Sequence, residues 1–168
     1  ICWSLVGSEM CIRDRNNLGS EQFDFLWLAI TNKYTWIPFY LYLIYLYFNS
    51  VKLKPKSIFV FFVVIGLMIL FTDQSSNLSK QYFQILRPCH DEEIYGLIRV
   101  VKESCGGLYG FFSAHSSNSF AVAGFFYFSL TNSNRWRKFL FLWAAIIAYS
   151  RVYCGVHFPS DVVIGGAY

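Results

Sequence analysis

Long apolar runs alternate with short polar segments along most of this chain. Four runs stand out, at residues 34–48, 58–71, 116–130 and 139–149, and a fifth begins at residue 162. An apolar face over Glu21 to Ile30 precedes them and is typical of a helix lying at a membrane interface. The pattern predicts an all-α protein, a polytopic transmembrane helical bundle of about four complete spans and a truncated fifth.

The apolar runs are short for this interpretation, because a bilayer takes ~20 residues of helix. Polar segments at residues 72–80 and 113–119 adjoin two of them. These segments would extend the helices if they face the protein interior or water instead of lipid. We therefore expect the second and third helices to be longer than their apolar parts.

Composition agrees with a membrane protein of one domain. The chain of 168 residues is 55% hydrophobic and 21% aromatic, with 14% charged residues. These values lie outside the range of ordinary soluble domains. The net charge of +4 is small and scattered, which argues against a nucleic-acid partner. The aromatic side chains fit core packing or interfacial belts.

The two ends of the chain differ from the rest. Residues 1–15, with Cys2 and Cys11, lack membrane periodicity and the order of a signal peptide, and they resemble a translated adapter sequence. We predict that residues 1–15 are non-native and that residues 16–168 form the domain. The last apolar run stops within about two turns, which predicts a domain truncated at its C-terminus.

Basic loops indicate the orientation of the helices. Two short loops carry cations without acids: Lys52, Lys54 and Lys56 in residues 49–56, and Arg135, Arg137 and Lys138 in residues 131–138. By the positive-inside rule both loops are cytoplasmic. Residues 72–112 and 150–161 then share the outer side. Together with the start of the third apolar run, they hold the three histidines.

Candidate chemistry begins with residues 150–161. Arg151 suits bidentate binding of an oxyanion, His157 can attack or shuttle protons, and Asp161 can orient the imidazole. Ionisable groups at a membrane boundary usually mark a function. Taken alone, the same residues also fit an arginine that reaches the interface and an aspartate that caps a helix.

Two further segments carry weaker signals. Lys80 and Arg87 are seven residues apart, which on a helix is two turns along one face, and Pro88 would end that helix. Ser113 and His115 open the third apolar run, where a helix N-terminus can bind phosphate. The alternatives are cations that extend to the interface for the first pair and a simple helix cap for Ser113.

In order and spacing, these segments resemble the signatures of the type 2 phosphatidic acid phosphatase (PAP2) superfamily. The signatures KxxxxxxRP, PSGH and SRxxxxxHxxxD appear here as KQYFQILRP, FSAH and SRVYCGVHFPSD. The first and third match at every defined position, whereas the second has Phe112 for Pro and Ala114 for Gly. The resemblance covers residues 17–168 and implies a PAP2/haloperoxidase-like helical fold.

The resemblance also implies roles. His157 would be the nucleophile that forms a phosphohistidine, Asp161 would orient it, and His115 would be the general acid and base. The phosphate-binding residues would be Lys80, Arg87, Ser113, Ala114 and Arg151. Neither a metal nor another cofactor is implied.

We therefore expect a lipid phosphatase in a bacterial inner membrane, facing the periplasm. Its substrate would be undecaprenyl pyrophosphate, phosphatidylglycerophosphate, phosphatidic acid or a lipid A phosphate. A phosphotransferase using the same intermediate and a noncatalytic protein that binds anionic headgroups are the alternatives. The motifs indicate no oligomeric state.

Two cysteines belong to the same predicted outer loop. Cys89 and Cys105 are sixteen residues apart. An oxidising compartment would allow a disulfide between them, worth about 3 kcal/mol in the entropic account. Two free thiols are the alternative. His90 lies beside Cys89, but acids surround it and no spaced partners suit a metal site.

Overall fold

The fold is known from a computed structural model that describes residues 12, 16, 19–50, 55–102, 104–130 and 135–168. Every regular element within these residues is a helix, and one isolated bridge pairs Leu86 with Tyr109. The prediction of an all-α protein is therefore confirmed. Most of residues 1–15, as well as Lys52 and Lys54 of the predicted cytoplasmic loop, lie outside the described residues.

The helices follow the apolar runs of the sequence closely. In chain order they are α2 (Glu21–Thr31), η1 (Lys33–Trp36), α3 (Ile37–Ser50), α4 (Pro55–Phe83), η2 (Pro88–His90), α5 (Glu92–Tyr95), α6 (Ala114–Ser129), η3 (Arg135–Lys138), α7 (Phe139–Tyr153) and α8 (Pro159–Ala167). Helix α2 corresponds to the predicted interfacial helix, and α8 to the start of the fifth run.

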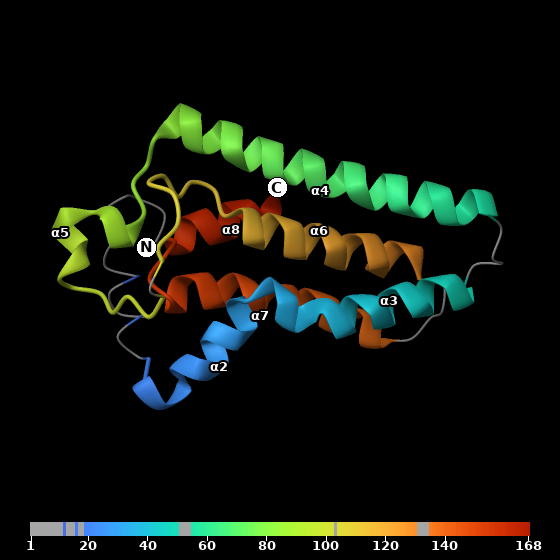
Figure 1. The fold of residues 1–168 in the computed structure, drawn as a ribbon, viewed down its shortest axis with the longest axis horizontal. Coiled ribbons are helices and arrows are strands. Elements are labelled where there is room, and N and C mark those ends of the chain that lie inside the picture. Colours follow the sequence, from blue (N-terminus) through green and yellow to red (C-terminus); the bar gives the residue numbers. More distant parts are fainter. Residues whose placement is uncertain (1–11, 13–15, 17–18, 51–54, 103, 131–134) are drawn as a thin grey trace.

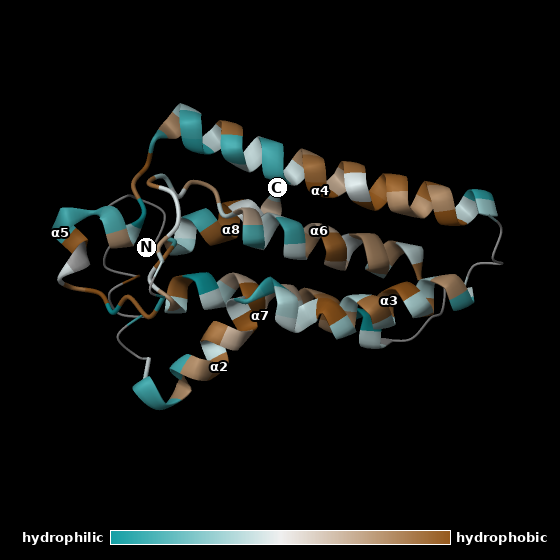
Figure 2. Ribbon diagram, in the orientation of Figure 1, coloured by the Kyte–Doolittle hydropathy of each residue, from teal (hydrophilic) through white to brown (hydrophobic). Residues whose placement is uncertain are grey.

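Helix α4 carries the polar extension that the sequence predicts. It has 29 residues; its middle is apolar, and its C-terminal part carries most of its hydrophilic residues (Figure 2). Among the described residues it is the one helix long and apolar enough to cross a membrane. Helices α3, α6 and α7 have 14, 16 and 15 residues, below the ~20 of a full span. The number of complete spans stays a prediction.

Helix α6 lies at the centre of the bundle, between α4 and α7, with α8 against its N-terminal half (Figure 1). The main core cluster brings Phe61 of α4, Val122 and Phe126 of α6 and Trp143 of α7 together. Trp143 also contacts the rings of Trp36 and Tyr40. These aromatic side chains therefore pack inside the bundle, as one of the two interpretations from composition predicts.

A close contact between α6 and α8 fixes the C-terminal segment. Gly165 lies so near Ser113 that a Cβ atom there would come within 2.6 Å of the Ser113 carbonyl oxygen. The Ser116 hydroxyl donates to the carbonyl of Val162 at 2.7 Å, and the Ser113 N–H donates to the carbonyl of Asp161 at 3.1 Å. The first turns of both helices are thereby held side by side.

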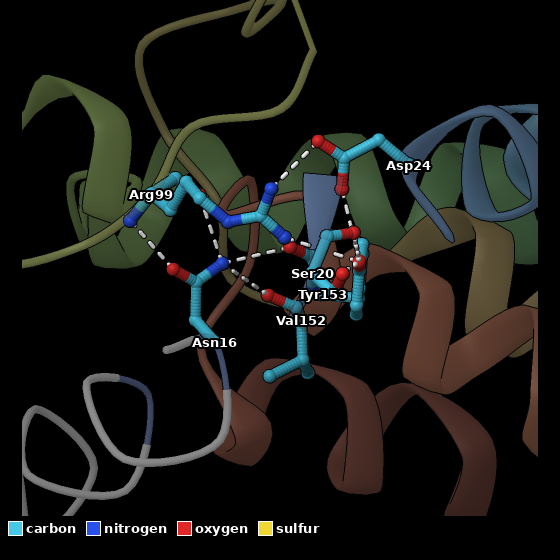
Figure 3. A network of polar contacts seen from close by, with 6 residues as sticks. All are labelled: Asn16, Ser20, Asp24, Arg99, Val152 and Tyr153. Atoms are coloured by element: carbon cyan, nitrogen blue, oxygen red, sulfur yellow. Dashed lines mark hydrogen bonds and ion pairs between the residues drawn. The ribbon is translucent and has the colours of Figure 1, made fainter. Parts of the chain in front are cut away.

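A partly buried polar network joins three distant parts of the chain to the end of α7 (Figure 3). The Asn16 amide donates to the carbonyls of Arg99 and Tyr153, at 2.9 and 2.7 Å, and accepts from the Arg99 N–H. Arg99 forms an ion pair with Asp24 at 2.6 Å and donates to the Tyr153 hydroxyl at 3.0 Å. This network anchors α2 and the loop before residue 102 to α7. Ile12 is also buried, against Ile94 and neighbouring apolar residues.

Candidate active site

The predicted site residues come from three segments that meet at one end of the bundle. The C-terminal ends of α4 and α7 and the N-terminal ends of α6 and α8 all point to this end (Figure 1). A Cβ atom on Gly110 would lie 3.1 Å from Arg87 Cγ, 3.1 Å from Asp161 Oδ2 and 3.6 Å from His157 Nδ1. Residues more than seventy positions apart in the sequence are therefore in one site.

His157 and Asp161 form a buried pair at its centre. His157 follows α7 in a turn, and Asp161 lies in the first turn of α8. The two residues are 2% and 0% exposed, and His157 Nδ1 lies 3.2 Å from Asp161 Oδ2. Asp161 Oδ2 also accepts the Phe158 N–H at 3.1 Å, which fixes the carboxylate. A carboxylate at Nδ1 holds a proton there, which leaves Nε2 with a free lone pair.

Burial and surrounding cations keep His157 neutral. Burial contributes most to lowering the pKa of His157 well below its ordinary value of 6.5, followed by Arg151, Arg87 and Lys80. Both causes disfavour a second positive charge in the site. The neutral imidazole is the form that can act as a nucleophile.

Arg151 is a buried cation without a carboxylate partner among the described residues. It lies in the last turn of α7, is 3% exposed, and donates from Nη1 to the Thr31 hydroxyl at 2.6 Å. Its Nε has no hydrogen-bond partner in the described part of the chain. Buried charges normally have partners. The guanidinium is therefore suited to an anion that enters the site.

Arg87 is placed differently from the prediction. Helix α4 ends at Phe83, so Lys80 and Arg87 do not share a helical face, and that expectation was wrong. Gln84 has a φ of 50°, a left-handed conformation that breaks the helix before Pro88. The Arg87 backbone N–H donates to Leu108 instead, at 3.1 Å.

The loop before α6 holds the Arg87 side chain. Its Nη1 donates to the Cys105 carbonyl at 2.9 Å and its Nε to the Tyr109 carbonyl at 3.2 Å. Cys89 and Cys105 are paired as a disulfide, with Cα atoms 6.4 Å apart. The disulfide thus closes the loop of residues 89–105, whose last residue provides one of the two carbonyls around Arg87.

The second motif opens α6. Ser113 is the N-cap residue, and its hydroxyl accepts the Ser116 N–H at 3.5 Å, so the capping interpretation describes its local role. Ala114 and His115 follow in the first turn, and neither has a positive φ. Alanine in place of the glycine of the signature is therefore compatible with the backbone. Lys80 lies in the last turn of α4, close enough for its charge to act on His157.

The cysteine pair also bears on the question of a metal. Within the described residues, the potential ligand atoms of Cys89, His90 and Cys105 lie within 4.8 Å of one another. Sulfurs joined in a disulfide are not thiolates and cannot serve as ligands. In its disulfide form this group is therefore not suited to bind a metal.

A known family model matches more than half of this chain. The PAP2 superfamily matches residues 57–168, which include all three motifs. The chain belongs to the PAP2 superfamily. Two bacterial relatives are both named lipid A 4'-phosphatase. The relative from Bacteroides thetaiotaomicron is 35% identical over 153 residues, and that from Porphyromonas gingivalis is 30% identical over 156.

The alignments cover 89% of this PAP2 chain in both cases, but 66% and 63% of the relatives, just under two thirds of their length. No solved structure matches it. The resemblance stated from the sequence is confirmed at the level of the family and of its bacterial members.

Three residues near this PAP2 site are missing from the sequence-based prediction. Thr31 supports Arg151 from 120 positions away, and no motif marks it. Lys102 lies near enough for its charge to act on His115 and is itself influenced by Arg151. Gly110 is visible in the sequence as one of several loop glycines, but its contact with Arg87, Asp161 and His157 depends on the tertiary structure.

Proposed function

We propose that this chain carries the catalytic site of a lipid phosphatase that removes phosphate from a lipid phosphate through a phosphohistidine. The observation that carries the proposal is the buried pair of His157 and Asp161 beside Arg87 and Arg151. A neutral nucleophile next to unsatisfied positive charge suits a phosphorus centre with anionic oxygens. The names of the two relatives favour a lipid A phosphate among the candidate lipids.

The reaction would take place in two steps. In the first, His157 Nε2 attacks phosphorus, the bond to the lipid oxygen breaks, and His115 gives that oxygen a proton. In the second, His115 takes a proton from water, the resulting hydroxide attacks phosphorus, and the phosphorus–nitrogen bond breaks to release phosphate. General acid and base catalysis of this kind contributes ~10²- to 10⁴-fold in rate.

The cations would act on the phosphoryl oxygens in both steps. Arg151 offers a buried Nε without a partner in the described chain, and Arg87 is held by two loop carbonyls. Lys80 would add a third charge, with the N–H groups at the start of α6. The proposed mechanism needs no metal because these groups neutralise the phosphoryl charge.

The proposed setting is the outer face of a bacterial inner membrane. Helix α4 is long and apolar enough to cross a bilayer, and its hydrophilic end leads into the site. Among the described cations of the two basic segments, Lys56 lies at the N-terminal end of α4, and Arg137 and Lys138 directly precede α7, so they are at the ends of these helices away from the site. By the positive-inside rule that end would be cytoplasmic and the site periplasmic.

Phosphate release by a full-length protein in detergent micelles would test this function. With lipid A phosphate as substrate, we expect activity in the presence of a chelator and a loss of at least ~10³-fold in His157→Ala. His90→Ala is the matched control, because His90 is exposed and lies outside the site. In His115→Asn, slow hydrolysis should allow labelled phosphohistidine to accumulate.

Three results would contradict the proposal. Unchanged activity in His157→Ala would exclude the nucleophile, and inhibition by the chelator that added magnesium reverses would indicate metal-dependent chemistry. Binding of the lipid with no turnover under any condition would favour the noncatalytic alternative.

A further inference from the structure

A cavity of about 450 Å³ opens beside the second catalytic histidine. Its walls come mainly from α3, α4 and α6, and are completed by the end of α2, by η1 and by one residue of α7. Most of the lining is apolar, including Trp36, Phe62, Ile65 and Val122. At one end it reaches Ala114 and His115 of the active site. Its volume lies in the range of ~300–1,000 Å³ that small-ligand sites occupy.

The cavity contains a polar cluster next to His115. Asn118 lies one turn after His115 on α6, and its side-chain amide donates to Asp73 Oδ1 of α4 at 2.8 Å. The Thr72 hydroxyl contacts Asn118 Oδ1 from the other side. The Asn118 carbonyl and one N–H of its NH₂ group are therefore used within the protein, and they fix the orientation of the Asp73 carboxylate.

Asp73 is left with an unused acceptor. Its Oδ2 makes no hydrogen bond with the described residues. The charge of Asp73 acts on Lys80, but no lysine or arginine among the described residues lies within ion-pair distance of Asp73. A carboxylate can only accept hydrogen bonds. The group that matches Asp73 is accordingly a hydroxyl or an amide N–H on whatever occupies the cavity.

The Asp73 carboxylate lies on the side of the site where the leaving group of the proposed reaction would be. In the proposed reaction His115 protonates the oxygen that departs with the lipid, so the atoms attached to that oxygen lie on the His115 side of the phosphate. Both Asp73 and Asn118 line the cavity at His115. A hydroxyl or amide close to the phosphate ester would meet Asp73, and the apolar chain beyond it would enter the cavity.

We propose that this cavity binds the leaving group of the substrate, with Asp73 as a specificity-determining residue that accepts a hydrogen bond from a hydroxyl or amide beside the phosphate ester. The inference rests on the proposed function and narrows its substrate class to phosphorylated lipids with such a donor, for example acylated amino sugars. Diacylglycerol phosphates and prenyl pyrophosphates have no donor at this place. Asn118 is a positioning residue for Asp73.

Asp73→Asn tests this assignment without changing the shape of the side chain. Because the Asn118 amide requires an acceptor, the new amide would direct its oxygen to Asn118 and its NH₂ group into the cavity. The variant therefore presents a donor where the wild type presents an acceptor. The matched control is Glu92→Gln, which removes one carboxylate at an exposed position on α5.

The assay compares three substrates with the full-length protein. Ceramide 1-phosphate has an amide and a hydroxyl near its phosphate, phosphatidic acid of matched chain length has neither, and phenyl phosphate lacks a lipid chain. We expect Asp73→Asn to lower kcat/KM for ceramide 1-phosphate about 10- to 100-fold, as for a hydrogen bond to a charged group. Its kcat/KM for the other two, and all values for Glu92→Gln, should stay within about 3-fold.

The apolar part of the cavity is tested separately with Ile65→Trp. The larger side chain would fill space next to α6, so kcat/KM should fall about 10-fold for long-chain lipids and remain unchanged for phenyl phosphate. The role of Asp73 would be refuted if Asp73→Asn lowered kcat/KM equally for all three substrates. It would also be refuted if kcat/KM for ceramide 1-phosphate did not fall.

Binding of the same lipids to His157→Ala, with and without Asp73→Asn, separates the two proposals. If the wild type hydrolyses neither lipid A phosphate nor any of these three substrates, the proposed function fails. The cavity assignment is then still supported if Asp73→Asn weakens the binding of ceramide 1-phosphate but not that of phosphatidic acid. It is overturned if ceramide 1-phosphate and phosphatidic acid bind equally well to His157→Ala with and without Asp73→Asn.

Discussion

Replacing Gly110 by alanine should slow the reaction while leaving the protein folded. Gly110 lies in the loop before α6, and its N–H donates to the Ile85 carbonyl at 2.8 Å. A Cβ atom at this position would come within 3.1 Å of Arg87 Cγ and Asp161 Oδ2. Contacts this close require a neighbour to move by a few tenths of an ångström.

The size of the effect follows from which neighbours move. Overpacking of a close-packed site costs about 1–3 kcal/mol. A displacement of ~1 Å in a catalytic group can cost about 100-fold in rate. A smaller displacement of Arg87 and Asp161 should therefore lower kcat about 10- to 100-fold. At about 2–4 °C per kcal/mol for a chain of this length, the cost of overpacking should lower the melting temperature by about 2–12 °C.

Gly107→Ala is the matched control in the same loop. A Cβ atom on Gly107 would meet nothing within 4 Å. We expect kcat of this variant within about 2-fold of the wild type, measured as phosphate release from phenyl phosphate and a lipid phosphate, with melting followed in parallel. Wild-type kcat in Gly110→Ala, or equal losses in both variants, would refute the argument from geometry.

Three further predictions address other parts of the molecule. Because burial and cations lower the pKa of His157 below 6.5, its ring should be protonated only at more acid pH. Ring-nitrogen NMR of labelled histidine should show a neutral His157 at pH 6.5, and a charged ring at that pH would contradict the prediction. Cys89→Ser should remove about 3 kcal/mol of stability and weaken phosphate binding through Arg87; an unchanged mass of the alkylated wild type after reduction would show that no disulfide exists. Asn16→Ala should remove about 3 kcal/mol, because it leaves the Arg99 N–H and the carbonyls of Arg99 and Tyr153 unpaired; equal urea midpoints for variant and wild type would argue against that role.

Local sequence patterns predicted most of the helices. The apolar runs and their polar extensions became α4, α6 and α7 because a helix is stabilised by residues three and four positions apart, which a sequence displays directly. The same local logic failed after Phe83. The spacing of Lys80 and Arg87 fits a helix, but the left-handed Gln84 and the pairing of Leu86 with Tyr109 redirect the chain.

The candidate site was predicted from motif order and spacing, and the structure brings those residues to one end of the bundle. The supporting residues were not predictable in this way. Thr31 belongs to no motif and contacts Arg151 across 120 positions in the sequence. Asn118 contacts Asp73 across 45 positions. Such contacts depend on how whole helices pack against each other, which single positions in the sequence do not encode.

By itself the sequence determined the helical class, the family and the identity of the chemical groups, since these depend on composition, short-range periodicity and the residues of three motifs. Only the tertiary structure decided the loop geometry of Arg87, the buried hydrogen bond from Arg151 to Thr31 and the cavity that Asp73 lines. The physical reason is range. Helix formation and motif chemistry act between neighbours in the chain, whereas burial, the pKa of His157 and the shape of the cavity come from residues that only folding brings together.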